Sequence, residues 1–277
     1  MKRLELTLAV TPVGALDLAS LAPHTLAGKS LDQVRRLRLR HGTRAQALGD
    51  LFAVNGETGG TLALRGLTAS CHHIGRGLVD GLIEASGTVG TGLGADMRGG
   101  ELRVRGNAGD GVGLGMRGGL IHVRGDAGER VGGALPGAVH GMNDGTIVIT
   151  GTVGARAGER MRRGLILIGD DCGPYLGDRL IAGTIAVFGQ AGEHAGLGMR
   201  RGTLLLGTRP ARLSDTFNPC GRFALGIVPL LARHVATIER RFGRAIERFA
   251  SAERWCGDMA QGGTGEILIA LAAEPAR

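Results

Sequence analysis

The sequence predicts an all-β solenoid: a right-handed parallel β-helix of about seven to eight coils, with a β extension before it and a helix after it. The first of three observations behind this prediction is an internal repeat in which glycines return at a fixed phase. The landmark glycines lie 18 to 21 residues apart, with one interval of 26, and they are Gly66, Gly87, Gly106, Gly125, Gly151, Gly169, Gly189 and Gly207. Because glycine adopts φ > 0 and lets two backbones approach closely, glycines at a fixed phase indicate corners at a fixed phase.

The second observation is a short alternating segment in each copy, such as residues 102–104 and 121–123, which predicts one strand. Together with two shorter apolar points per copy, three short strands with glycine corners would close into a coil. Stacked coils would pair as parallel sheets, and the right-handed rule for parallel crossovers sets the handedness. The third observation is a methionine at one phase. We therefore expect one buried stack of Met97, Met116, Met161 and Met199, with Met142 in a stretched copy, next to columns that contain Ala108, Val112, Ala127 and Val131.

Three segments follow one another along the chain. Residues 1–58 are an N-terminal extension with an opening strand at 4–8 and a strand-like segment at 34–39, and residues 59–208 are the glycine-repeat β-helix. Residues 209–277 are a C-terminal segment in which 225–250 form one amphipathic helix. Its apolar stripe comprises Leu231, Val235, Ile238, Phe242, Ala245 and Phe249. We expect this helix to lie along the rod or to cap it, because a solenoid has open ends and edges that need covering.

Composition narrows the class of protein. The 52 glycines show no three-residue period, which excludes collagen. The formal net charge is +8, and Lys2 and Lys29 are the only lysines among 33 basic residues, so 31 are arginines. With 3% aromatic residues and no nucleic-acid-binding module, this charge favours an acidic partner chain or a polyanionic ligand over nucleic acid. Four scattered cysteines without a CxxC motif favour reduced thiols in a cytoplasmic protein, and no apolar run is long enough to span a membrane.

The sequence contains no recognisable catalytic constellation: neither GxSxG nor HExxH occurs. Residues 113–118 match GxGxxG, but the next copy begins seven residues later, which is too soon for the helix of a dinucleotide-binding unit. Cys71, His72 and His73 are the one group that invites a metal interpretation. Because adjacent residues rarely ligate one ion, we expect a polar loop with a buried thiol, with a metal site as the alternative. No catalytic, cofactor-binding or metal-binding residue is assigned.

Two departures from the repeat are candidate partner contacts. The copy from Gly125 to Gly151 has seven extra residues within 133–141, and the apolar character of this loop indicates burial, either against a partner or back on the rod. Arginines follow the column methionines and should form a ladder, either as a solvated face with ion pairs of under about 1 kcal/mol each or as an electropositive strip for a partner. The candidate contact residues are Leu135, Pro136, Val139, His140, Arg98, Arg117, Arg162 and Arg200.

The repeat, written GxAGxxVGxxMxxGxIxV, resembles the C subunit of formylmethanofuran dehydrogenase and is also similar to the glycine-repeat C-terminal domain of the large subunit of glutamate synthase. The flanking residues 21–23, 26–30 and 48–52 (LAP, LAGKS and LGDLF) favour the dehydrogenase C-subunit family. So do residues 257–258 and 263–267 (GD and GTGEI). The resemblance extends in order over nearly the whole chain. The Cys71-His72-His73 insertion is not part of the family's pattern, so no role is transferred to it.

This resemblance implies a noncatalytic β-helical scaffold, a subunit of an enzyme complex rather than the enzyme itself. One setting is a bacterial formyltransferase/hydrolase complex of methylotrophic one-carbon metabolism. Such a complex moves a formyl group from tetrahydromethanopterin to a methanofuran-type carrier and releases formate. The implied partners are an amidohydrolase-like and a formyltransferase subunit in a cytoplasmic hetero-oligomer, which hold the metal and the carrier. The alternatives are the C subunit of a tungsten or molybdenum formylmethanofuran dehydrogenase, a free-standing bridging domain of the glutamate synthase type, and an enzyme in its own right. The arginine-rich composition favours the bacterial setting.

Overall fold

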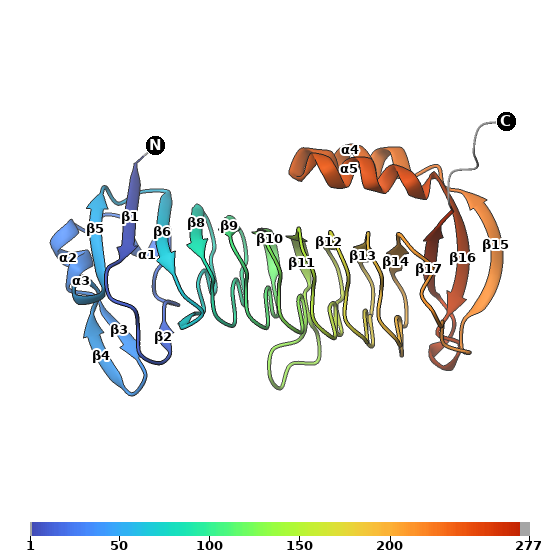
Figure 1. The fold of residues 1–277 in the computed structure, drawn as a ribbon, viewed down its shortest axis with the longest axis horizontal. Coiled ribbons are helices and arrows are strands. Elements are labelled where there is room, and N and C mark those ends of the chain that lie inside the picture. Colours follow the sequence, from blue (N-terminus) through green and yellow to red (C-terminus); the bar gives the residue numbers. More distant parts are fainter. Residues whose placement is uncertain (1, 272–277) are drawn as a thin grey trace.

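The chain is mostly β, with one large mixed sheet, one small sheet and a few helices (Figure 1). The computed structural model describes residues 2–271. The large sheet has 13 strands in the order β15-β16-β17-β14-β13-β12-β11-β10-β9-β8-β6-β1-β5, and the small one has four in the order β4-β3-β2-β7. No helix among residues 2–271 is long and apolar enough to cross a membrane.

The repeated part of the chain supplies the parallel centre of the large sheet. Each strand pairs in parallel with the strand of the next copy; Ile121, for example, lies between Leu102 and Ile147. A second column of single bridges joins Val89, Ala108, Ala127, Val153, Cys172 and Ala191 in succession. The strands of this centre are β6 (Thr61–Leu67), β8 (Leu82–Gly87), β9 (Glu101–Arg105), β10 (Arg117–Arg124), β11 (Asp144–Ile149), β12 (Leu165–Ile168), β13 (Thr184–Val187) and β14 (Thr203–Leu206).

The methionine column lies in the core, as the sequence predicts. Met97, Met116, Met142, Met161 and Met199 are fully buried, and so are Val112 and Val131, while Ala108 and Ala127 are 6% and 7% exposed. Each methionine packs its terminal methyl against a glycine of the next coil. A Cβ on Gly145, which has φ +99°, would lie 2.7 Å from Met116 Cε. Glycine and methionine are therefore complementary: the missing Cβ of one makes room for the methyl of the other.

The N-terminal extension continues the large sheet and adds the small one. Strand β1 (Arg3–Leu8) pairs in parallel with β6 and antiparallel with β5 (Phe52–Gly56). The small sheet contains β2 (Leu16–Asp17), β3 (Arg38–His41), β4 (Arg44–Ala47) and β7 (Cys71–His72), and short helices lie between the strands: α1 (Pro23–Leu26), α2 (Leu31–Arg35) and α3 (Leu48–Leu51).

The strand-like segment predicted at 34–39 is wrong in its first half. Residues 31–35 form α2, because Ser30 and Gln33 cap its first turn: Gln33 N donates to Ser30 Oγ at 3.2 Å, and Ser30 N donates to Gln33 Oε1 at 2.9 Å. The extended part begins only at Arg38, in β3. The reciprocal cap favours a helix here, although the alternating arginines and leucines that follow are typical of a strand.

The single helix predicted at 225–250 is also wrong. The structure has α4 (Val228–Ile238), α5 (Arg240–Ile246) and the 3₁₀ turn η1 (Glu247–Ala250), and Glu239 between α4 and α5 is extended at φ −143°, ψ 107°. The break lets both short helices turn an apolar face to the sheet. Phe242 and Gly243 of α5 are buried, and a Cβ on Gly243 would collide with Ala236 of α4. The residues of the predicted apolar stripe therefore lie on α4, α5 and η1 instead of one long helix.

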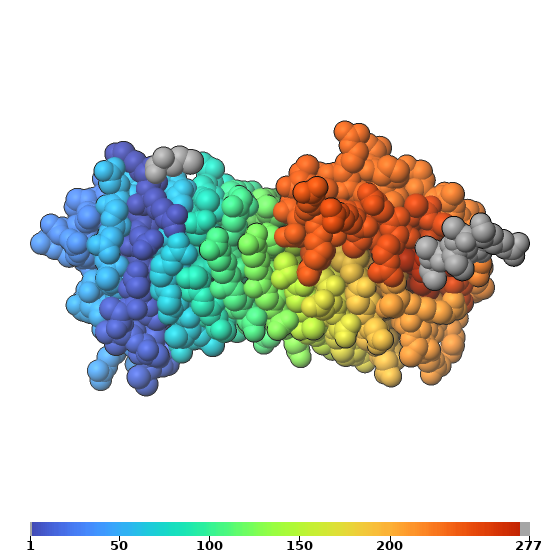
Figure 2. Space-filling model, turned by 45° about the horizontal axis from the view of Figure 1, so that its top comes forward, coloured from blue at the N-terminus to red at the C-terminus, as the bar shows by residue number. Residues whose placement is uncertain are grey.

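The two helices lie along the rod and cover the outer face of its C-terminal half (Figures 1 and 2). One register row of the large sheet explains where the cover begins. In the N-terminal half this row contains Glu84, Arg103 and His122, and from β11 onward it contains Val148, Leu167, Ala186 and Leu205. The apolar part of the row packs against the helices. The change from charged to apolar side chains therefore sets the limit of the helical layer.

His122 and Glu239 mark that limit. His122 is 7% exposed, and its Nε2 lies 3.5 Å from Glu239 Oε2 without forming a hydrogen bond. Burial lowers the pKa of His122, although Glu239 acts to raise it. A lowered histidine pKa favours the neutral ring in the folded state. The folded state is therefore most stable, as far as His122 is concerned, at pH values above the ordinary histidine pKa of 6.5. Its free energy of unfolding declines as the pH falls below 6.5, because the unfolded chain then binds a proton more readily.

Three C-terminal strands that the sequence does not predict complete the large sheet. Strand β17 (Gly265–Ala270) pairs in parallel with β14, and β16 (Ser251–Gly257) and β15 (Asn218–Ala224) follow antiparallel, with η2 (Met259–Gln261) between β16 and β17. Both ends of the parallel centre are thus closed by antiparallel strands. The outermost strand, β15, is exposed along its length and contains Pro219 and Gly221, residues that discourage further edge pairing.

Candidate partner-binding surface

The loop at 133–141 is a closed excursion from one coil (Figure 1). Met142 N donates to Gly132 O at 2.8 Å, in the same way as Met116 N donates to Gly113 O at 3.1 Å in the preceding coil. The extra residues are therefore inserted between two positions that are already bonded to each other. Along the loop, Pro136 and His140 are exposed, Leu135 is half-buried and Val139 is 71% exposed.

Arginines from the coils hold the base of this loop. Arg130 Nη2 donates to Ala134 O at 2.7 Å, and Arg130 Nε lies 3.0 Å from Glu159 Oε2. Arg160 Nη1 donates to Ala138 O at 3.3 Å. The loop separates two hollows, one of about 580 Å³ and one of about 300 Å³, and Leu135 and Pro136 contribute to the lining of both. The loop is thus held upright between two cavities and does not fold flat on the rod.

The predicted arginine ladder is a real column, but it is interrupted. Backbone bonds run from Arg98 N to Leu78 O, from Arg117 N to Met97 O, from Arg162 N to Met142 O and from Arg200 N to Leu180 O, all at 2.7 or 2.8 Å. The same bonds place Asn143 and Ile181 in the column between the arginines. The column is therefore not a continuous positive strip.

The four arginines of this column differ in their partners. Arg98 and Arg117 share Asp96, at 3.4 Å and 3.0 Å, so the inter-turn ion pairs expected of a solvated face do occur there. Arg162 and Arg200 form no ion pair with any residue in the range 2–271. Arg200 lines the larger hollow together with Leu135, Pro136, Val139 and His140, whereas Arg98, Arg117 and Arg162 do not.

Three arginines of the larger hollow are not among the contacts predicted from the sequence: Arg130, Arg160 and Arg179. Arg160 and Arg179 have left-handed backbones, with φ +53° and +54°. They precede Met161 and Leu180, and the same place in other coils is held by Gly77, Gly115 and Gly198 and, in one coil, by the left-handed Asp96. An arginine where the repeat has glycine is a signal that the sequence contains, and it could have identified both residues.

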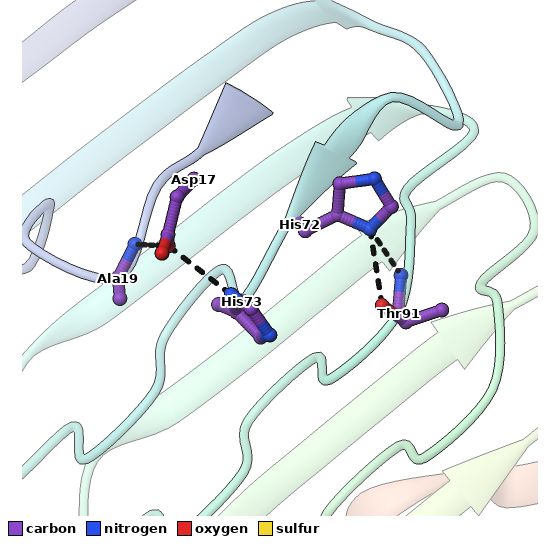
Figure 3. A network of polar contacts seen from close by, with 5 residues as sticks. All are labelled: Asp17, Ala19, His72, His73 and Thr91. Carbon is purple, nitrogen blue, oxygen red and sulfur yellow. Dashed lines mark hydrogen bonds and ion pairs between the residues drawn. The ribbon is translucent and has the colours of Figure 1, made fainter. Parts of the chain in front are cut away.

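Cys71, His72 and His73 serve separate local roles, and Figure 3 shows the separate contacts of His72 and His73. Cys71 is fully buried, and burial raises the pKa of its thiol. His72 Nδ1 lies 3.0 Å from Thr91 Oγ1, and His73 Nδ1 lies 3.1 Å from Asp17 Oδ1. Burial also lowers the pKa of His72. Within residues 2–271, no three His, Cys, Asp or Glu side chains are grouped so as to hold a metal ion. The insertion ties the N-terminal extension to the first coils.

Comparison with known proteins gives three kinds of match. A family model described as the GXGXG motif matches residues 42–220. The C subunit of tungsten-containing formylmethanofuran dehydrogenase 2 from Methanothermobacter thermautotrophicus and from Methanothermobacter wolfeii is 34% identical over 100 residues, which is 34% of this chain. The matched part spans 37% of the length of these curated relatives.

A solved structure matches over a much greater length. It is the crystal structure of the formyltransferase/hydrolase complex (FhcABCD) from Methylorubrum extorquens in complex with methylofuran. One of its chains superposes with a TM-score of 0.90 at 35% identity, and the match covers 97% of this chain and 100% of that chain.

Proposed function

We propose that this chain, which belongs to the GXGXG-motif family, is the noncatalytic structural subunit of a formyltransferase/hydrolase complex. Within that family it belongs to the C subunits of formylmethanofuran dehydrogenases and bacterial formyltransferase/hydrolase complexes. The complex would serve methylotrophic one-carbon metabolism. It would transfer a formyl group from tetrahydromethanopterin to a methanofuran-type carrier and release formate. The observation that supports this most strongly is the match, over 97% of this chain, with one chain of the Methylorubrum complex.

The C subunit of a tungsten-containing formylmethanofuran dehydrogenase is the second candidate. The 34% identity to two such proteins favours it, but this identity extends over only 100 residues. The match to the bacterial complex has similar identity over nearly three times that length and covers 97% of this chain. The bacterial complex is therefore the better supported of the two.

The proposed architecture is the one expected from the repeat: a right-handed parallel β-helix over residues 59–208, between an extension at 1–58 and a segment at 209–277. The parallel strands in register, the second column of bridges and the buried methionine column support it. Handedness rests on the rule for parallel crossovers. Such a rod buries its apolar side chains internally and offers long outer faces, which suits a scaffold.

The proposed partners are an amidohydrolase-like subunit and a formyltransferase subunit, in a cytoplasmic hetero-oligomer without nucleic acid or membrane. The metal and the methanofuran-type carrier would lie on these partners, and this chain would hold no cofactor of its own. Exposed Val139 and the unpaired guanidinium of Arg200 beside the larger hollow support partner contact at the 133–141 loop. The four free cysteines are compatible with a reducing compartment.

The purified single chain should have no formyltransferase, amidohydrolase or redox activity and no stoichiometric metal. The sequence contains neither GxSxG nor HExxH, and no three His, Cys, Asp or Glu side chains of residues 2–271 are grouped to hold a metal ion. The measurement is turnover assayed in parallel for the chain alone, the complete complex and the complex lacking this chain, with elemental analysis of each. Activity should be high only in the complete complex. Turnover by the chain alone, or one metal ion per chain, would contradict the proposal and return attention to Cys71, His72 and His73.

A further inference from the structure

The larger hollow is electropositive, and most of its charge is uncompensated. Four arginines and one glutamate line it, which leaves three positive charges in excess: Arg130, Arg160, Arg179 and Arg200 against Glu159. The glutamate is committed to Arg130, at 3.0 Å. The remaining three guanidiniums form no ion pair with any residue in the range 2–271. A concave surface with three unpaired guanidiniums is suited to carboxylates, which guanidinium binds in a bidentate manner.

The nearby acidic side chain Asp178 does not neutralise this charge. It is half-buried, forms no ion pair with the described residues and does not line the hollow. Burial raises its pKa, although Arg179 acts to lower it. The side chain of Arg179 lines the hollow, is exposed and forms no hydrogen bond or ion pair with the described residues.

The backbone is also unfavourable at two of these arginines. Arg160 and Arg179 take φ of +53° and +54°, a region that side chains other than glycine enter at a cost in strain. Other copies of the repeat place Gly77, Gly115 and Gly198 at this corner, and one places Asp96 there at φ +53°, so the fold itself makes no demand for arginine. Arg160 and Arg179 each directly precede their column residue, so the two guanidiniums project from successive coils on the same side.

The shape of the hollow indicates an extended occupant. Arg160 and Arg179 stand on adjacent coils, whose parallel backbones lie about 4.8 Å apart, and Ile181 and Arg200 continue along the rod toward Gln261. Leu135, Pro136 and Val139 form an apolar wall on the opposite side. A β-like segment with carboxylates on alternate residues places successive carboxylates about 6.8 Å apart, within reach of long arginine side chains on neighbouring coils.

We propose that the hollow between the 133–141 loop and Arg160, Arg179 and Arg200 is a docking groove for an extended, acidic segment of a partner protein in the complex. Its alternate Asp or Glu carboxylates pair with the three guanidiniums, and its intervening apolar side chains contact Leu135 and Val139. This proposal rests on the proposed function for the existence of the partner. It adds the place, the chemistry and the extended form of the partner's contact.

The first test uses the purified full chain and a fluorescently labelled peptide of alternating glutamate and glycine. Binding is followed by fluorescence anisotropy. The variants are Arg160→Gly, Arg179→Gly and the double variant. Glycine suits the left-handed backbone, so Arg179→Gly should keep the thermal midpoint of the fold. Arg160→Gly also removes the hydrogen bond to Ala138 O in the loop, so Arg179→Gly is the variant that isolates the loss of charge. The control is Arg156→Gly: it also relieves a left-handed residue, φ +60°, and removes one positive charge, but it lies outside the hollow.

Each groove variant should weaken peptide binding about tenfold or more, as expected for the loss of a hydrogen bond to a charged group. The control should bind within about twofold of the original chain, since screening leaves little long-range effect of one charge. High salt should remove the difference. Equal weakening by Arg156→Gly and Arg179→Gly would overturn the proposal, because net charge alone would then explain binding.

The second test uses the assembled complex and identifies the occupant. A photo-reactive amino acid replaces Ile181 on the floor of the groove, and mass spectrometry identifies the captured peptide. The expected capture is a segment of a partner protein with Asp or Glu on alternate residues. An intact complex with a capture that lacks carboxylates, or with none, would overturn the docking groove and leave the proposed function standing. Specific peptide binding by a chain that assembles with no partner would instead refute the proposed function.

Discussion

Replacing Met116 with aspartate should lower the free energy of unfolding by about 4–5 kcal/mol, a large effect for a single substitution. Met116 is fully buried, and its terminal methyl packs over Gly145 of the next coil. Aspartate would remove that contact and place a carboxylate where no described side chain can pair with it. Because the column methionines of successive copies belong to one core cluster, the destabilisation should extend beyond the copy that contains Met116. Chemical denaturation followed by circular dichroism measures it.

Met116→Leu is the matched control. It keeps the apolar character and nearly the volume, so it should cost less than about 1.5 kcal/mol. A second comparison is Arg117→Asp, one residue further along, whose side chain is exposed. Apart from the loss of the Arg117–Asp96 ion pair, that substitution should change the free energy of unfolding by about 0.5 kcal/mol or less. If Met116→Asp unfolded like the original chain, the methionine column could not be the core of the rod.

Shortening the 133–141 loop should leave the rod folded and remove a partner. Residues 133–141 can be replaced by a Leu-Gly pair, the sequence that stands between Gly113 and Met116 in the preceding coil. Gly132 and Met142 are already hydrogen bonded, so the shortened coil needs no new backbone geometry. The bonds of Arg130 and Arg160 to loop carbonyls would be lost, at a cost of less than about 2 kcal/mol.

Partner affinity should fall at least about tenfold in the same variant, because the loop supplies the apolar wall of the larger hollow and its most exposed apolar side chain, Val139. Surface plasmon resonance against the partner proteins measures the change. A full-length loop in which Leu135, Pro136, Val139 and His140 are all serine serves as the control and separates the contribution of side chains from that of length. Unchanged affinity of the shortened chain would show that the loop is only a surface insertion.

The repeat explains why much of the fold could be predicted from the sequence. A residue at one phase meets the same residue type one coil later, so the burial of Met97, Met116, Met161 and Met199 follows from their spacing alone. The position of the 133–141 loop follows in the same way, from the one interval that is too long. Because the same pattern recurs in several copies, an interpretation made for one copy can be checked against the others.

The parts outside the repeat had no such support. Strands β15, β16 and β17 are strands chiefly because β14 offers them an unpaired edge, and this edge is created by tertiary structure. The stripe from Leu231 to Phe249 is typical of one helix because periodicity alone does not reveal the extended residue at Glu239. The helix at 31–35 was different: the capping pair Ser30 and Gln33 was visible in the sequence and was outweighed by the alternating pattern.

The contact residues predicted from the sequence do not all meet in one place. The loop residues and Arg200 line one hollow, whereas Arg98, Arg117 and Arg162 do not. Whether any of them contacts a partner stays a prediction. Arg160 and Arg179 lie outside the arginine column that follows the methionines, so the spacing of that column does not identify them. They stand at a corner where most other copies have glycine and one has Asp96, which is also left-handed.

The most direct test of the central claim, that this chain is the scaffold of a formyltransferase/hydrolase complex, is affinity purification of the chain from cells that express it natively. The purified material is analysed by native mass spectrometry. The account predicts that an amidohydrolase-like protein and a formyltransferase co-purify with it in a fixed ratio and withstand washing at moderate salt. Recovery of the chain alone, while both of these proteins are present in the same cells, would contradict the account.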